Sequence, residues 1–284
     1  MIRPRHLLHP VRSATSLYRR IGFHIYLRLA GRKLRRIPRG RRDRCWCDAE
    51  LLPFEWHPSY GLCPECGCYV NRRPPLNLKQ LYSFDRYWHT MQKIQGNPTI
   101  EDRSQAYKSD GRLDYWLKLI ERYGPPKGHV IEVGCSPGIL LEELKALGYQ
   151  CIGVEPDEKS AEWIRRNNAV EVRSGLFPDL ELPPCDLFLA FDVLEHTPCP
   201  ERFMKEAAHL LNTGGIALIQ VPVERFDFDD PFKQRPDFFN DLEHLFLFTD
   251  RAITKLAALT QLETIELEDN PCLPGHVMCV FKKA

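Results

Sequence analysis

A glycine-containing turn between an apolar run and an amphipathic run is the feature of this 284-residue sequence that most constrains its fold. The stretch His129–Gly148 opens with the β-branched run Val130–Val133, turns at Gly134 and Gly138, and continues with leucines at helical spacing. This order predicts a strand, a tight turn and a helix. Glycine lets the backbone approach a ligand closely, and the N–H groups at a helix start suit polar or anionic ligand groups. We therefore expect a ligand-binding turn of an α/β domain.

An acidic residue follows this unit at the end of a second predicted strand. The strand covers Cys151–Val154, and Glu155 comes directly after it. An acidic side chain about 20 residues beyond such a turn can accept hydrogen bonds from the hydroxyls of a ribose. The first two strands therefore predict a nucleoside-containing ligand. For these residues alone, a Rossmann-like turn that binds NAD, or no ligand, is the alternative.

A second stretch of the sequence, residues 185–222, gives further evidence on the fold and the ligand. Residues 185–222 read CDLFLAFDVLEHTPCPERFMKEAAHLLNTGGIALIQVP. The pattern predicts a buried strand at Asp186–Phe191, a helix at Pro200–Leu211, a turn at Asn212–Gly215 and another strand at Ile216–Val221. Between the two runs we expect a helix at Glu158–Asn168 and a third strand, residues 169–173. Strands that alternate with helices in this way indicate a parallel sheet covered by helices.

These motifs resemble those of class I S-adenosylmethionine-dependent methyltransferases. The run Glu132-Val-Gly134-Cys-Ser136-Pro-Gly138 matches their glycine-rich motif, with serine where the middle glycine is common, and Glu155 matches their acidic motif. The phrase D-V-L-E-H, residues 192–196, resembles the small-molecule and sugar methyltransferases of this class. The resemblance implies a Rossmann-like seven-stranded sheet in the order 3-2-1-4-5-7-6 with the last strand antiparallel.

The resemblance also implies the site. S-adenosylmethionine contacts are implied at the glycine-rich turn and at the ends of the second, third and fourth strands: Glu132, Gly134, Cys135, Ser136, Gly138, Glu155, Pro156, Ser174, Gly175, Leu176 and Asp192. His196 and His244 are the candidate catalytic residues, as a base or as substrate contacts, because a neutral imidazole accepts a proton near pH 7. Hydrogen bonding within their own loops is the alternative for both. Some relatives bind a divalent ion through a pair such as Glu195-His196, and Tyr107 and Arg112 lie where relatives often cover the cofactor or contact substrate.

The C-terminal part completes the expected sheet. Residues 223–242 form an irregular insertion, and residues 243–249 resemble the H-x-x-x-F-T segment of the same group. Thr249 is expected to cap a helix at Asp250–Leu259. Two further strands are expected at Leu262–Leu267 and His276–Phe281, as the terminal antiparallel pair.

Two pairs of cysteines precede this domain, Cys45-x-Cys47 and Cys63-x-x-Cys66, with fifteen residues between them. This spacing predicts a zinc site with four thiolate ligands, which replaces a hydrophobic core too small to form otherwise. Cys68 and His57 are further candidate ligands. Four thiolates leave the metal no open position, so we expect a structural role.

The N-terminal segment is strongly basic. Residues 1–44 carry fourteen Lys or Arg and one acid, whereas the rest of the chain carries twenty-five Lys or Arg and thirty-seven acids. Leu17, Ile21, Ile25 and Leu29 recur at every fourth position beside arginines, which predicts a basic amphipathic helix. Such a helix could lie on an anionic membrane surface, bind a nucleic-acid backbone or dock on the body of the protein.

Composition and motifs together suggest four regions: a basic helix and tail at 1–44, a cysteine knuckle at 45–75, helices that lead in and cover the cofactor at 76–124, and the methyltransferase domain at 125–284. The hydrophobic share of 43% and charged share of 27% are ordinary for a globular protein. Eleven cysteines without a convincing signal peptide favour a reducing, cytoplasmic location, with peripheral contact to the inner membrane surface through the basic helix.

Three hypotheses for the function remain open. The first is O-methylation of a sugar, surface glycan or small metabolite, because a cysteine knuckle followed by such a domain resembles bacterial enzymes that methylate these acceptors. The second is an RNA methyltransferase that uses the basic tail and the knuckle, although the Asn-Pro-Pro-Tyr run typical of amino-methylating enzymes is absent. The third is a non-catalytic protein that binds S-adenosylmethionine.

Overall fold

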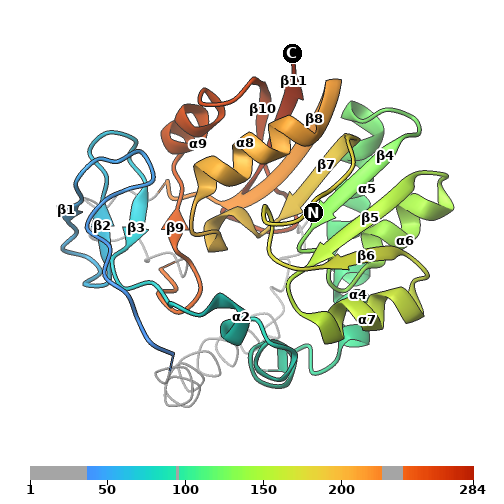
Figure 1. The fold of residues 1–284 in the computed structure, drawn as a ribbon, viewed down its shortest axis with the longest axis horizontal. Helices are drawn as coiled ribbons and strands as arrows, with labels where there is room; N and C mark the ends of the chain where they lie inside the picture. The colour runs from blue at the N-terminus through green and yellow to red at the C-terminus, as the bar shows by residue number, and fades with distance from the viewer. Residues whose placement is uncertain (1–36, 94–95, 226–238) are drawn as a thin grey trace, which may run out of the picture.

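The structure, a computed structural model, describes residues 37–93, 96–225 and 239–284 (Figure 1). The basic amphipathic helix expected near the N-terminus lies outside the described residues. Most of the irregular segment expected at 223–242 does as well.

A seven-stranded sheet forms the centre of the molecule (Figure 1). Along the sheet the strands follow the order β6-β5-β4-β7-β8-β11-β10, which confirms the expected order 3-2-1-4-5-7-6. Strand β11 runs antiparallel to both of its neighbours, and the pairs from β6 to β8 are parallel. The strands are β4 (His129–Val133), β5 (Gln150–Glu155), β6 (Glu171–Ser174), β7 (Cys185–Phe191), β8 (Leu211–Pro222), β10 (Leu262–Asp269) and β11 (His276–Lys283).

Helices cover both faces of the sheet because its strands are apolar on both sides. Val130 and Leu189 face one apolar cluster with α5, α6 and α7, whereas Ile131 and Phe188 face a second cluster with α8 and α9. Thr249 caps α9 as expected, since its hydroxyl accepts from the Ala252 amide. The helices are α5 (Arg112–Tyr123), α6 (Ile139–Ala146), α7 (Glu158–Asn167), α8 (Pro200–Leu210) and α9 (Asp250–Ala257).

The turn between β4 and α6 needs both of its glycines. Gly134 has φ +74° and Gly138 has φ +86°, in the left-handed region that favours glycine. The Gly134 amide donates to the Val154 carbonyl over 2.8 Å, which ties the turn to the end of β5. Gly138 stands at the start of α6. The turn therefore lies at the carboxyl ends of the two central strands.

The structure corrects one expected boundary. Asn212–Gly215 is not a turn before the strand, because β8 already begins at Leu211, directly after α8. The pairing with β7 jumps from Cys185–Leu211 to Leu187–Ile216, so the intervening residues bulge out of the ladder. Gly214 has φ +78°, and this conformation lets the strand accommodate the bulge.

A second, four-stranded sheet joins the cysteine-rich segment to the large domain. Its strands are β1 (Leu52–Pro53), β2 (Tyr60–Leu62), β3 (Tyr69–Asn71) and β9 (Phe246–Leu247), in that order. The first three come from the cysteine-rich segment, but β9 comes from the C-terminal third (Figure 1). The two parts of the chain therefore share one sheet.

Short helices lead from the small sheet to the large one. They are α2 (Leu78–Leu81), α3 (Phe84–Arg86), a π-helical turn η1 (Tyr87–Gln92) and α4 (Ile100–Ser109), and a 3₁₀ turn η2 (Leu194–His196) follows β7. Among the helices of the described ranges, none combines the length and the apolarity that crossing a bilayer requires.

Candidate active site

A cavity of about 380 Å³ opens at the carboxyl ends of β4, β5 and β7. Most of the residues expected to form the site line it: Gly134, Ser136, Glu155, Pro156, Gly175, Leu176, Asp192, His196 and His244. Four expected cofactor contacts are not among the lining residues: Glu132, Cys135, Gly138 and Ser174. The structure thus brings the glycine-rich turn, the acidic residue and both histidines to one cavity.

The cavity has two halves, and the first is the part beside the glycine-rich turn and the end of β5. Glu155 and Ser136 are polar residues of this first half. Glu155 is only 7% exposed, and its Oε1 accepts from the Asp157 amide over 3.1 Å. Burial raises the pKa of Glu155 to about 8, because water no longer stabilises its charge. The Ser136 hydroxyl is buried without a hydrogen-bond partner in the described part of the chain. Both groups fit a ligand that carries several hydroxyl or amine groups.

Two of the expected residues that do not line the cavity, Glu132 and Cys135, are buried next to the glycine-rich turn. Glu132 is buried, burial raises its pKa to about 8, and its Oε2 has no hydrogen-bond partner in the ranges described. The Cys135 sulfur would lie 2.5 Å from a Cβ placed on Gly153, so the turn packs tightly on β5. Side chains of this kind hold the backbone of the turn in place.

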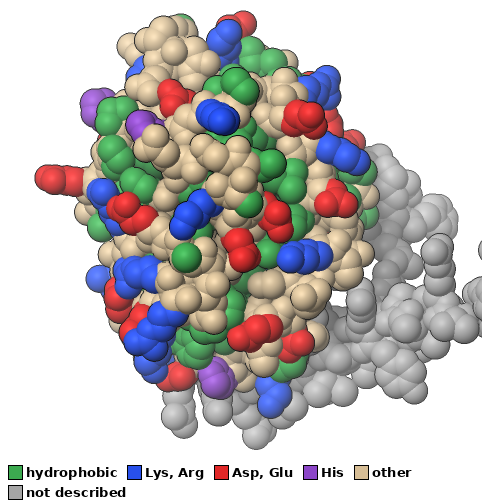
Figure 2. Space-filling view, turned by 90° about the vertical axis from the view of Figure 1, so that its right-hand side faces the viewer, with side chains coloured by type: hydrophobic (Ala, Val, Ile, Leu, Met, Phe, Trp, Pro, Cys, Tyr) green, Lys and Arg blue, Asp and Glu red, His purple; other side chains and the backbone are tan. Residues whose placement is uncertain are grey.

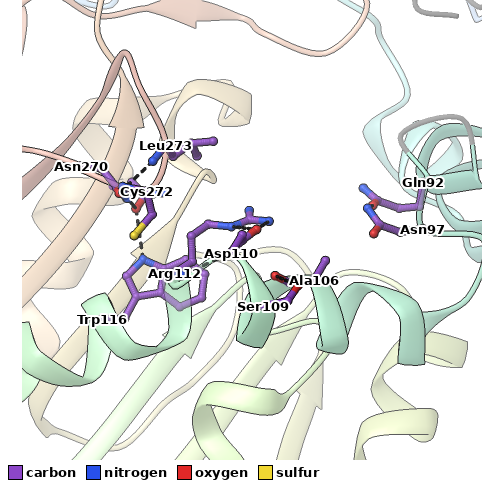
Figure 3. A network of polar contacts seen from close by, with 11 residues as sticks. Gln92, Asn97, Ala106, Ser109, Asp110, Arg112, Trp116, Asn270, Cys272 and Leu273 are labelled. Atoms are coloured by element: carbon purple, nitrogen blue, oxygen red, sulfur yellow. Dashed lines mark hydrogen bonds and ion pairs between the residues drawn. The ribbon is translucent and has the colours of Figure 1, made fainter. Parts of the chain in front are cut away.

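Asp192 stands where the two halves of the cavity meet. It has φ +57°, and its Oδ1 accepts from the Gln220 side chain over 2.9 Å. The Gln220 carbonyl oxygen accepts from Asn270 over 2.6 Å and from Trp116 over 3.1 Å. Asn270 is held by the amide of Leu273, and Figure 3 shows it in its loop above α5. This chain of bonds fixes Asp192 from three separate elements.

Glu195, His196 and His244 form the second half of the cavity, and one ligand atom from each lies within 4.8 Å of the others. The His196 Nδ1 lies 3.0 Å from the Glu243 carbonyl. A carbonyl only accepts, so Nδ1 carries the proton and Nε2 keeps its lone pair in the neutral ring. Burial, helped by the neighbouring His244, lowers the pKa of His196 to about 3. His196 is therefore neutral near pH 7.

The carboxyl groups beside these histidines are buried as well. Glu195 is 1% exposed, and its Oε2 has no hydrogen-bond partner among the described residues. Burial and the nearby charge of Asp192 raise the pKa of Glu195 well above its usual range, and burial raises that of Glu243 to about 7. The Glu195 Oε1 lies 3.6 Å from the His196 Nε2. This half of the cavity thus brings two buried carboxyl groups with raised pKa values next to two imidazole rings.

Sequence reasoning missed several lining residues. Tyr82, Arg103 and Glu243 line the cavity, and the buried hydroxyl of Tyr82 has no partner in the described ranges. Tyr107, expected to cover the ligand, lines the cavity between two guanidinium groups, Arg103 at 4.6 Å and Arg112 at 4.2 Å from its ring. Arg112 itself pairs with Asp110 (Figure 3). The many aromatic residues of segment 76–124 indicate that it lies near the ligand. Their spacing in the sequence does not distinguish the residues that line the cavity from those that pack in the core.

Four cysteines of the expected zinc site lie together, and their sulfur atoms are within 4.8 Å of one another: Cys45, Cys47, Cys63 and Cys66. The Sγ–Sγ distance is 3.6 Å for Cys45–Cys66 and 3.5 Å for Cys47–Cys63. Sulfurs about 2.3 Å from one tetrahedral ion lie about 3.8 Å apart. The four side chains therefore fit a single zinc ion.

The other two candidate ligands lie outside this cluster. The Cys68 thiol, directly before β3, donates to the Leu247 carbonyl of β9 over 3.2 Å. The His57 Nδ1 accepts from the Ser59 amide over 3.2 Å. Cys68 lies beside the four-cysteine cluster, in contact with Cys66, and His57 is not a member of the cluster.

Comparison with known proteins agrees with this geometry. Residues 107–267, more than half of the chain, match a family described as a methyltransferase domain. The ubiquinone biosynthesis O-methyltransferase of Coxiella burnetii is 32% identical over 108 residues, which cover 35% of this chain and 46% of that protein. A probable S-adenosylmethionine-dependent methyltransferase of Mycolicibacterium smegmatis is 30% identical over 118 residues, with 38% and 46% covered. These matches span under half the length of either relative.

Solved structures share the fold. The magnesium protoporphyrin IX methyltransferase of Synechocystis PCC 6803 with bound S-adenosylmethionine aligns with a TM-score of 0.54 at 13% identity, over 74% of this chain and 98% of that one. A possible histamine N-methyltransferase of Thermotoga maritima aligns at 0.50 and 21% identity, over 69% and 99%. At such identities the likeness shows the fold alone. Sheet order, site geometry and the match over residues 107–267 together place the chain in the methyltransferase-domain family, with the fold of class I S-adenosylmethionine-dependent methyltransferases.

Proposed function

We propose that this protein transfers a methyl group from S-adenosylmethionine to a hydroxyl group of a sugar, surface glycan or small metabolite. One observation carries the proposal: a single cavity joins the glycine-rich turn and Glu155 to the group formed by Glu195, His196 and His244. A donor in the first half and an acceptor in the second half would therefore meet beside Asp192. Holding two reactants in such a geometry is a main source of rate in group transfer.

The residues of the first half fit the cofactor. Glu155 would accept hydrogen bonds from the ribose hydroxyls, and the unpartnered hydroxyl of Ser136 would bond a polar group of the ligand. Gly134 leaves room for the close approach of the ligand to the backbone. Bound S-adenosylmethionine supplies a methyl group that is already activated by the positive sulfur, so the protein needs only to orient the acceptor and receive its proton.

The second half offers what a hydroxyl acceptor needs. The Nε2 lone pair of His196 can receive the hydroxyl proton, and the unpartnered hydroxyl of Tyr82 can donate to a second oxygen. Buried polar atoms without partners are costly, so an acceptor with several hydroxyl groups would stabilise them.

A divalent cation is a second way to use the same residues. Glu195, His196 and His244 are near enough to bind one ion, and the bond from His196 Nδ1 to a carbonyl is the usual support of a metal-bound imidazole. Such an ion would lower the pKa of a bound hydroxyl group. Repeating the transfer assay with and without added Mg²⁺ separates the two variants of the proposal.

We propose further that the four-cysteine cluster binds a structural zinc ion, and that the protein works in a reducing, cytoplasmic compartment, since all eleven cysteines are free thiols. An RNA acceptor remains the alternative. It receives no support from the face shown in Figure 2, where basic and acidic side chains are interspersed, since surfaces that bind a phosphate backbone gather basic residues in one stripe.

The test incubates the purified protein with methyl-labelled S-adenosylmethionine and an extract of its source, fractionated into RNA, protein, lipid-linked glycan and small molecules. We expect label in the glycan or small-molecule fraction. Glu155→Ala should abolish labelling by preventing cofactor binding, whereas His196→Ala should retain binding of S-adenosylhomocysteine and lose labelling.

Label confined to RNA would overturn the proposed acceptor class in favour of the RNA hypothesis. Tight binding of S-adenosylmethionine without label in any fraction would instead favour a non-catalytic protein. Comparing the two variants also shows whether the two halves of the cavity have separate roles.

A further inference from the structure

The segment that carries His244, residues 240–247, is held from two sides. The Leu245 amide donates to the Glu195 carbonyl of the large domain over 2.8 Å, and further bonds come from the cysteine-rich segment. We call residues 240–247 the His244 segment, and residues 39–75 the cysteine-rich unit. The Asn71 side chain donates to the carbonyls of Asp241 over 2.9 Å and His244 over 3.1 Å. The Tyr60 hydroxyl donates to the same His244 carbonyl over 2.9 Å. The Asn71 amide also donates to the Leu245 carbonyl over 2.9 Å.

These contacts are buried, and they adjoin the backbone pairing of β2 with β3 and of β3 with β9. Asn71 is 0% and Tyr60 is 1% exposed, and the two residues pair across β2 and β3. Strand β3 then pairs with β9 directly after His244. Buried hydrogen bonds are costly to break, because each carbonyl left alone loses its solvation without compensation. The position of His244 therefore depends on the hairpin of β2 and β3.

The hairpin in turn depends on the cysteine cluster. Cys63 and Cys66 stand in the turn between β2 and β3, and the Gly67 amide donates to the Cys63 carbonyl over 2.9 Å. Strands of two or three residues cannot hold such a unit by pairing alone. A metal bound by the four thiolates would supply the missing folding energy.

The first half of the cavity has different supports. Gly134 is bonded to the end of β5, and Glu155 is bonded to the start of α7 through Asp157. Both lie within the large sheet and its helices. The first half is therefore built within the large domain, whereas the second half joins Glu195 and His196 of η2 to the His244 segment.

We propose that the cysteine-rich unit is a clamp for the acceptor half of the site: Asn71 and Tyr60 position His244 and Glu243, and metal binding by the four cysteines sets that half without changing cofactor binding. This inference rests on the proposed function, because it assigns the second half of the cavity to the acceptor. It makes Asn71 and Tyr60 positioning residues that lie outside the catalytic domain.

The test combines side-chain NMR of the histidines with calorimetry of S-adenosylhomocysteine binding, on the full chain. His244 is assigned by the signal that His244→Gln removes. In Asn71→Leu, and in wild-type protein stripped of zinc under reducing conditions, the His244 and His196 signals should shift or broaden, while the distant His209 stays unchanged. The affinity for S-adenosylhomocysteine should stay within about twofold, since distant sites behave additively.

Two further variants sharpen the test. Tyr60→Phe keeps the ring and removes one donor, so it should shift the His244 signal less than Asn71→Leu does. Its spectrum still tests the proposal if the Asn71→Leu variant does not fold. The matched control is Arg251→Ala, which removes a bond of 2.8 Å from α9 to the Glu65 carbonyl but none to the His244 segment. It should leave the His244 signal as in the wild type.

An unchanged His244 signal in folded Asn71→Leu or Tyr60→Phe, or a parallel loss of cofactor affinity, would overturn the clamp. Failure of the proposed function has a different signature, because then the transfer assay would leave the glycan and small-molecule fractions unlabelled, whereas the NMR comparison would still report on the clamp.

Discussion

At the scale of single residues, the ionisation of Glu155 should make the affinity for the cofactor depend on pH. Its pKa is raised to about 8 by burial, so its carboxyl is largely protonated in the ligand-free protein at neutral pH. Ribose hydroxyls bind better to the ionised form, because a carboxylate is the stronger acceptor. Cofactor affinity should therefore rise with pH up to about 8, by at most about tenfold per pH unit, and level off above it.

Calorimetry with S-adenosylhomocysteine from pH 6 to 9 measures this slope, and buffers of different ionisation enthalpy detect the proton released on binding. Glu155→Gln should remove the slope. Glu132→Gln is the control for the second buried carboxyl near the turn, whose pKa is also raised to about 8, and should keep most of it. A flat wild-type profile would contradict the assignment of Glu155 to the ribose.

At the scale of elements, the turn between β4 and α6 combines backbone strain with crowding. A Cβ on Gly134 would approach Val193 to 2.6 Å at φ +74°, so alanine there should cost about 1–2 kcal/mol in backbone strain alone and also displace the loop after β7. Gly134→Ala should lower both the melting temperature and the affinity for S-adenosylhomocysteine.

The bulge of β8 supplies the control for this change. Gly214 has φ +78° and a Cβ there would meet no atom within 4 Å, so Gly214→Ala has the strain without the crowding. It should lower the melting temperature and leave the affinity unchanged. Equal affinity losses in both variants would show that the crowding at Val193 plays no part.

Most of the elements could be predicted from the sequence, since β-branched runs and leucines at helical spacing mark them locally. The Asn212–Gly215 bulge could not, because glycines allow both a turn and a bulge, and pairing with β7 decides between them. The pairing of β3 with β9 joins residues far apart in the sequence, and a two-residue strand has no periodicity to detect. Asn71 and Tyr60 were missed for the same reason.

At the scale of the whole molecule, the cysteine cluster is the testable link between the two sheets. We expect about one zinc ion per chain, measured by elemental analysis, because four sulfurs lie at the spacing of one tetrahedral site. Cys63→Ser should release the zinc and lower the melting temperature. Cys68→Ser is the matched control, since that buried thiol donates to the Leu247 carbonyl and is not one of the four clustered sulfurs, although it contacts Cys66, and it should retain the metal. Zinc loss in Cys68→Ser would revise the ligand set.

The pairing of β3 with β9 also orders the events of synthesis. Tyr69 and Leu247 are register partners, so the chain between these two strands contains β4 to β8 of the large sheet. The ribosome releases the four cysteines long before it releases β9, so metal can bind early, while the pairing must wait for the last part of the chain. A nascent chain that already carries β4 to β8 therefore has the residues that face the cofactor, whereas the acceptor half still lacks Glu243 and His244.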